Sequence, residues 1–136
     1  MSCVIDSSVA VSWVLDDERT KANLAVLDQV VAHGAVVPAI WHLEVANSLT
    51  IALRRERTTA FLRDQAFADL GELDIEIDGE TTAIAWSATV GIADRYRLTV
   101  YDAAYLELAQ RRRLPLATLD RTLAAAAQQA GVALAL

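Results

Sequence analysis

The stretch Cys3-Val4-Ile5-Asp6-Ser7-Ser8 decides the fold, because it sets an acid between a short apolar run and the start of a helix. The first three residues are typical of a strand that is buried on both faces. Ser7 and Ser8 offer N-caps for a helix that we expect to run through about Leu15. The chain therefore begins with a strand, an acid and a helix.

The same alternation of short apolar runs and longer helical patterns continues along the chain. Strands are expected at 3–5, 35–37, 74–77, 114–118 and 132–134, and helices at about 7–15, 20–33, 40–57, 58–71, 100–113 and 121–130, with one or two further helices over 80–96. This order predicts an α/β sandwich with a mostly parallel sheet, in which 74–77 is an edge or half-buried strand. A length of 136 residues is typical of one domain, so we expect a single domain over 1–136.

Composition limits the class of protein. Hydrophobic residues make up 54% and charged residues 22%, which is a globular composition. No apolar run approaches the roughly 20 residues that span a bilayer, so no membrane partner is expected. The N-terminus lacks the basic and long apolar segments of a signal peptide, and the single cysteine, Cys3, cannot form an internal disulfide. These features favour the cytoplasm.

The formal net charge of −6 argues against a nucleic-acid partner. Two features reduce that objection: the arginines are clustered at 54–57, 95–97 and 111–113, and bound cations would cancel several acids. The clusters at 54–57 and 111–113 are expected mainly to be solvated residues that complement helix ends.

Four acids stand out by their positions. Asp6 and Asp120 each follow a strand and precede a helix, so both fall at the carboxyl edge of a parallel sheet, where open α/β folds bind ligands. Asp102 lies at the start of its helix among apolar neighbours. Glu44 lies in a helix that is apolar nearly all round, where a carboxylate is costly unless it is paired or bound to a metal.

Carboxylates gathered at one edge repel each other unless a dense positive charge compensates them. The sequence has no His/Cys set of the zinc type, and all-oxygen ligands select a hard ion, Mg²⁺ or Mn²⁺. Such ions hold phosphate oxygens and lower the pKa of a bound water, and two of them can stabilise an in-line displacement. Phosphodiester hydrolysis is the chemistry that follows.

Simpler interpretations of the four acids stay open at this point. Asp6 and Asp120 are also good N-caps, and Asp102 suits the positive end of a helix dipole. Glu44 also suits a buried ion pair, with Arg54 as one candidate partner.

Other protein classes fit the sequence less well. A haloacid-dehalogenase-like phosphatase with Asp6 as nucleophile would need an acid two residues on, where Ser8 stands. A receiver-type binding domain with an acidic pocket would need a late lysine, whereas the only lysine is Lys21.

Four segments in this order resemble a PIN-domain ribonuclease, the toxin of a VapBC-type toxin–antitoxin pair (a VapC toxin). They are 4–9, 38–47, 98–105 and 116–120. The resemblance covers the whole chain and implies a three-layer α/β/α sandwich with about five strands. It also implies that Asp6 and Asp102 bind Mg²⁺ or Mn²⁺ directly, and that Glu44 and Asp120 complete the catalytic site through water.

The resemblance extends to the pocket and the partners. Ser8 and Thr118 match polar positions that line the pocket, and Asn47, one turn past Glu44, either orients that acid or is a polar surface residue. The implied substrate is RNA, typically a tRNA or a ribosomal loop, cut to leave a 3′-hydroxyl and a 5′-phosphate. The implied protein partners are a second copy in a homodimer and a small antitoxin. Alternatives are an RNA-processing nuclease outside such a pair and a non-catalytic PIN fold, which the four intact acids oppose.

Overall fold

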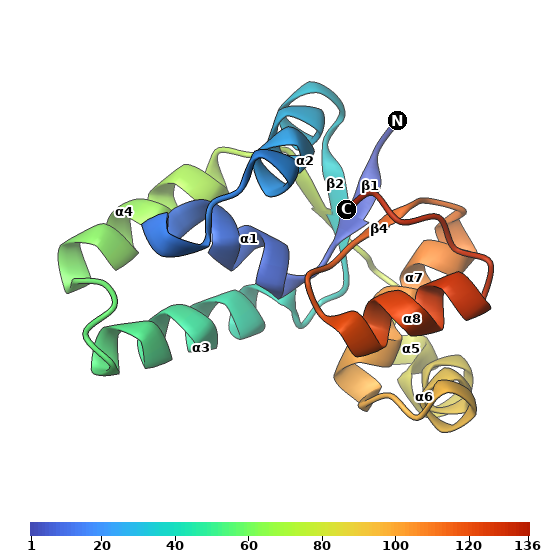
Figure 1. Ribbon diagram of the computed structural model, residues 1–136. Helices are drawn as coiled ribbons and strands as arrows, with labels where there is room; N and C mark the ends of the chain where they lie inside the picture. The colour runs from blue at the N-terminus through green and yellow to red at the C-terminus, as the bar shows by residue number, and fades with distance from the viewer.

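The computed structural model describes every residue of the chain, 1–136. In chain order the elements are β1 (Cys3–Ile5), α1 (Ser7–Val14), the 3₁₀ turn η1 (Asp16–Glu18), α2 (Lys21–His33), β2 (Ala35–Val37), α3 (Trp41–Arg54), α4 (Ala60–Gly71), β3 (Ile75–Ile77), α5 (Thr81–Ile84), the π-helical segment η2 (Ala85–Thr89), α6 (Val90–Tyr96), α7 (Val100–Arg112), β4 (Leu116–Ala117) and α8 (Arg121–Gln129). Figure 1 shows α1 to α4 to the left of the strands and α5 to α8 to the right, so helices cover both sides of the sheet.

The sheet contains four parallel strands in the order β3-β2-β1-β4. The central strand β1 pairs with β2 through Cys3 and Ala35, and with β4 through Ile5 and Ala117. β3 lies at the edge, and its residues are half-buried or exposed, as the alternating pattern at 74–77 predicts. The predicted three-layer α/β/α arrangement with a parallel sheet is confirmed.

The expected fifth strand at 132–134 is reduced to one isolated bridge between Leu116 and Leu134. Two backbone hydrogen bonds form it: the Leu116 N–H donates to Ala133 O, and the Ala135 N–H donates to Leu116 O, both at 2.9 Å. Because β4 is only two residues long, a longer ladder has nothing further to pair with. The sheet therefore has four strands rather than about five.

Helix boundaries differ from the expected ones by a few residues. The helix expected from 58 is capped instead by Thr59, whose hydroxyl accepts the Leu62 N–H at 3.2 Å. The helix expected at 40–57 ends at Arg54, and the region 80–96 divides into α5, η2 and α6. Gly34 closes α2 as predicted, with a φ of 76° that suits glycine.

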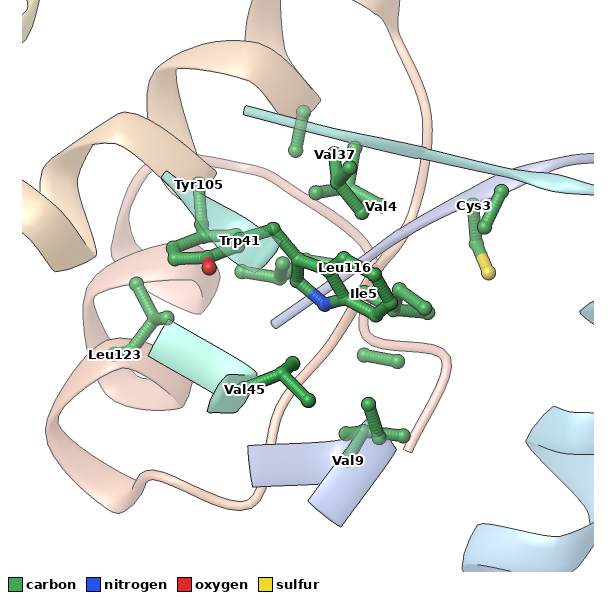
Figure 2. Close-up of a cluster of buried hydrophobic side chains, with 14 of the residues drawn as sticks. Cys3, Val4, Ile5, Val9, Val37, Trp41, Val45, Tyr105, Leu116 and Leu123 are labelled. Atoms are coloured by element: carbon green, nitrogen blue, oxygen red, sulfur yellow. The ribbon is translucent and has the colours of Figure 1, made fainter. Parts of the chain in front are cut away.

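The core lies between the sheet and both helical layers. Every residue of β1, β2 and β4 is buried, which explains why these strands read as continuous apolar runs. Figure 2 shows Ile5 and Leu116 of the central strands beside Trp41 of α3, and Leu123 of α8 lies further out in the same core cluster. This packing fixes the strand ends, and with them the residues that follow each strand. No helix of the protein combines the length and the apolar character needed to cross a membrane.

Arg111 corrects the expectation that the arginines at 111–113 are solvated. Its guanidinium donates to Asp78 at 2.7 and 3.0 Å, to Glu107 at 3.0 Å and to Glu80 at 2.8 Å. Asp78 and Glu107 are buried, so these bonds compensate carboxylates that water cannot reach. Burial alone would raise the pKa of Asp78, but the hydrogen bonds from Arg111 and Thr81 lower it below its usual value.

Arg111→Gln is expected to lower the free energy of unfolding by about 3 kcal/mol at neutral pH, because it leaves buried carboxylates without their cation. Since the folded pKa of Asp78 is lowered, its contribution to stability is present above its unfolded pKa of about 4 and disappears as the pH falls through the folded value. Urea unfolding at neutral and acidic pH measures both effects. The exposed, unpaired Arg55 is the control, since Arg55→Gln is expected to change stability by less than about 0.5 kcal/mol. Equal midpoints for the two variants would contradict this account.

Candidate active site

Each of the four acids lies at the start of a helix, on the carboxyl side of the sheet. Asp6 directly follows β1 and is the N-cap of α1, and Asp120 is the N-cap of α8, three residues past β4. Glu44 and Asp102 lie in the first turns of α3 and α7. Because β1 pairs with β4, with the Asp6 N–H donating to Ala117 O at 3.1 Å, the first two acids come from neighbouring strand ends. We call these four residues the acidic cluster.

The acidic cluster is within mutual electrostatic reach. Burial, together with the charges of Asp120, Asp6 and Glu44, raises the pKa of Asp102 to about 6. Burial also raises the pKa of Glu44, with a smaller contribution from the charge of Asp6. Like charges disfavour ionisation of a carboxyl group, so the other three acids lie near enough to raise the pKa of Asp102.

Asp6 is the most enclosed member of the acidic cluster, with 5% of its surface exposed. Its Oδ1 accepts the Ser8 hydroxyl at 2.6 Å and the Val9 N–H at 3.2 Å, and its Oδ2 accepts the Thr118 hydroxyl. Burial raises the pKa of Asp6, and the three hydrogen bonds partly oppose that rise. The bond from Val9 makes Asp6 itself the cap of α1, in place of the expected Ser7 or Ser8.

Ser8 and Thr118 connect the two strand ends as well as holding Asp6. The Ser8 hydroxyl accepts the Leu119 N–H at 3.0 Å, and the Thr118 hydroxyl accepts the Asp120 N–H at 3.0 Å. These two side chains, singled out from the sequence as pocket positions, therefore fix the loop that carries Asp120. Asn47, by contrast, is exposed and forms no side-chain hydrogen bond with Glu44.

Glu44 is held by a residue that the sequence analysis did not assign to the site. The buried Tyr105 donates its hydroxyl to Glu44 Oε1 at 2.5 Å. The candidate ion pair with Arg54 is absent, and Arg54 is exposed at the far end of α3. One signal was available in the sequence: Tyr105 lies three residues after Asp102, which puts both on one face of α7.

Free oxygens distinguish the four carboxylates. Asp102 accepts no hydrogen bond from any protein group, whereas Asp6 accepts three. Asp120 accepts only the Leu123 N–H, on Oδ1 at 2.8 Å, and Glu44 accepts only the Tyr105 hydroxyl. A carboxylate has about four acceptor positions. Asp102 therefore keeps all of its ligand capacity, while Asp6 keeps about one position.

These residues fit a hard divalent cation, although no three His, Cys, Asp or Glu side chains are arranged to hold one ion together. Mg²⁺ typically takes only one or two protein carboxylates and keeps several waters. The cluster offers oxygen ligands alone, with Asp102 fully free and the others partly free. A cation would also remove the repulsion that raises the pKa of Asp102.

Asp102→Asn is expected to raise the melting temperature of metal-free protein by a few degrees near neutral pH. The folded pKa of Asp102, about 6, lies above its unfolded value of roughly 4, so the folded state binds more protons. The stability that this provides is fully present below about pH 4 and is lost as the pH rises through about 6. The melting temperature of the variant should therefore exceed that of wild type only at the higher pH.

Thermal melts in EDTA at about pH 4 and about pH 7 measure this difference. Asp28→Asn is a matched control, because Asp28 is exposed on α2 and forms no ion pair. An Asp102→Asn protein that melts below wild type at both pH values would mean that Asp102 stabilises the fold and is not repelled.

Comparison with solved structures finds the same fold in ten chains, and three of them illustrate the likeness. PAE2754 from Pyrobaculum aerophilum superposes with a TM-score of 0.68 at 21% identity, over 93% of this chain and 79% of that one. A toxin–antitoxin complex from Klebsiella pneumoniae gives 0.60 at 15% identity, over 87% and 86% of the two chains. FitAcB from Neisseria gonorrhoeae gives 0.65 at 19% identity, over 98% and 96%. At these identities the likeness is one of fold.

Sequence comparison identifies the family. A search of curated proteins found no relative that matches this chain. The family model of the PIN domain, however, matches residues 3–129, which includes the whole acidic cluster and all four strands. The chain therefore belongs to the PIN domain family, whose fold is a nuclease fold.

Proposed function

We propose that this protein is a Mg²⁺- or Mn²⁺-dependent endoribonuclease that hydrolyses RNA phosphodiester bonds. The observation that carries the proposal is the carboxylate of Asp102, which accepts no hydrogen bond from the protein although the charges of three nearby acids act on it. Carboxylates crowded in this way lose stability on ionisation unless a cation binds between them. In a nuclease fold, a cation at that position lies where a phosphate would bind.

The proposed roles of the residues follow from their free oxygens. Asp102 and Asp6 would hold the ion directly, Asp102 with both oxygens available and Asp6 with its remaining position. Glu44 and Asp120 each keep one oxygen without a protein donor and would hold water around the ion. When bound, the ion would neutralise charge on the phosphate and make water more acidic.

Hydrolysis requires a bond from a water oxygen to phosphorus while the bond from phosphorus to the 3′-oxygen breaks. We assign acceptance of the water's proton to Asp120, the exposed member of the acidic cluster, whose Oδ2 has no protein partner. The 3′-oxygen leaves and takes a proton from solvent, which gives a 3′-hydroxyl and a 5′-phosphate. Ser8 and Thr118 keep Asp6 and Asp120 in fixed relative positions throughout.

We extend the proposal to a toxin role in the cytoplasm, with an antitoxin and a second copy of the chain as protein partners. The likeness of fold to a toxin–antitoxin complex supports an antitoxin, in preference to RNA processing outside such a pair. Large apolar side chains also remain exposed on α4, at Phe61, Leu62 and Phe67. Apolar surface of this kind suits a protein partner. The buried free thiol of Cys3 agrees with a reducing compartment.

Cleavage of single-stranded RNA by the purified protein is expected to require Mg²⁺ or Mn²⁺ and to stop in EDTA. Asp102→Asn should reduce the metal-dependent rate on the order of 100-fold or more, because it removes the carboxylate with the most free ligand capacity. Lys21→Ala, at the start of α2, should cut like wild type. A gel assay of labelled RNA with and without chelator measures all three proteins.

Two outcomes would count against the mechanism. Sustained cutting in EDTA would show that cleavage needs no metal. Full activity of Asp102→Asn would show that the acidic cluster is not the catalytic site.

Tyr105→Phe is expected to weaken metal affinity or activity by about 10- to 100-fold, although it deletes only one oxygen. The physical reason is that Glu44 loses the single donor that fixes its carboxylate. Tyr101→Phe is the matched control, because Tyr101 lies one turn earlier on α7, is exposed and forms no side-chain hydrogen bond. Calorimetric titration with Mn²⁺ compares the two variants with wild type. Equal affinities for wild type and both variants would show that the hydrogen bond from Tyr105 to Glu44 has no role in metal binding.

A further inference from the structure

A shallow pocket of mixed polar and apolar lining lies between the end of α6 and one face of α8. It has a volume of about 370 Å³ and is lined by Tyr96, Arg121, Thr122, Ala125, Ala126 and Gln129. Pockets that bind small ligands start at about 300 Å³. We call this hollow the α6–α8 pocket.

The position of the α6–α8 pocket relates it to the site. Arg121 directly follows Asp120, so the pocket begins one residue beyond the acidic cluster. From there it follows α8 to Gln129, a helical distance of roughly 12 Å. A strand of RNA that runs from the acidic cluster along α8 would pass this pocket with an adjacent nucleotide.

The charge of this region differs from that of the molecule as a whole. Arg95, Arg97 and Arg121 form no ion pair, whereas Arg111 and Arg112 are bound to carboxylates. Arg121 lines the pocket itself, and Arg95 lies against Tyr96, which also lines it. Although the net charge of the protein is −6, two arginines without an ion pair therefore lie at the α6–α8 pocket.

The chemistry of the lining matches the parts of a nucleotide. Tyr96 offers an aromatic ring for stacking, and the Arg95 guanidinium lies 5.5 Å from the centre of that ring. Gln129 carries an amide that can both donate to and accept from a base edge. Arg121 offers a guanidinium that suits phosphate oxygens. Aromatic, amide and cation occur together in this one hollow.

We propose that the α6–α8 pocket binds one nucleotide of the RNA strand beside the scissile phosphate, with Arg121 on its phosphate and Tyr96 and Gln129 on its base. The inference rests on the proposed ribonuclease function. It explains how a protein with a negative net charge would bind RNA. It makes Arg121, Tyr96 and Gln129 substrate-binding residues rather than surface residues.

The test measures binding of a short fluorescent single-stranded oligoribonucleotide by anisotropy, with Mg²⁺ present and in an Asp102→Asn background that suppresses cleavage. Ala125→Glu fills the pocket with a like charge, and Arg121→Gln removes the phosphate contact. Each is expected to weaken binding by about tenfold. Arg121→Gln should also reduce the slope of log affinity against log salt by about 0.7.

Matched controls come from α2. Asp6 precedes the first residue of α1, whereas α2 begins after the last residue of α1. Ala25→Glu makes the same change at an exposed alanine, and Lys21→Gln removes the same charge from the same first helical position. Both should bind like the background protein. Affinity losses in Ala25→Glu and Lys21→Gln that equal those of the pocket variants would overturn the pocket. Unchanged affinity in both pocket variants would overturn it as well.

Cleavage by wild type, measured separately, distinguishes this inference from the proposed function. Metal-dependent cleavage together with unchanged binding in the pocket variants overturns the pocket alone. Weakened binding in the pocket variants without cleavage by wild type overturns the ribonuclease and keeps an RNA-binding pocket.

Discussion

Parallel pairing of β1 with the two-residue strand β4 is the constraint on which the rest of the structure depends. It brings the first and last parts of the chain together, so that Asp6 and Asp120 follow neighbouring strand ends. The buried apolar side chains of both strands fix this register, because a slip of one residue would turn them out of the core. The candidate site is thus a consequence of the pairing of β1 with β4, and α3 and α7 add Glu44 and Asp102 to it.

Gathering four like charges opposes folding, and the fold compensates three of them individually. Asp6 accepts three hydrogen bonds, Asp120 caps α8, and Glu44 accepts the Tyr105 hydroxyl. Asp102 alone accepts none, and its pKa is raised to about 6. Capping and ligand binding are therefore not alternatives for Asp6 and Asp120, because a helix cap occupies only part of a carboxylate.

Local pattern was sufficient to predict the parallel sheet, the buried strands and the four acids at helix starts, since each depends on short segments. It failed where the outcome depends on distant partners. Tyr105 meets Glu44 from another helix, and Arg111 meets Asp78 across the sheet edge, so neither contact is visible in the spacing of one element. The prediction of a full fifth strand failed because its partner, β4, is too short to extend a ladder.

The measurement that tests the central claim most directly is the number of protons released when Mn²⁺ binds, obtained by calorimetry in buffers of different ionisation enthalpy. If the acidic cluster is one cation site, binding near pH 6 should release about half a proton, because Asp102 is about half protonated there. At about pH 8 the release should fall to nearly zero. Mn²⁺ binding with no proton release near pH 6, or no binding at all, would contradict the account.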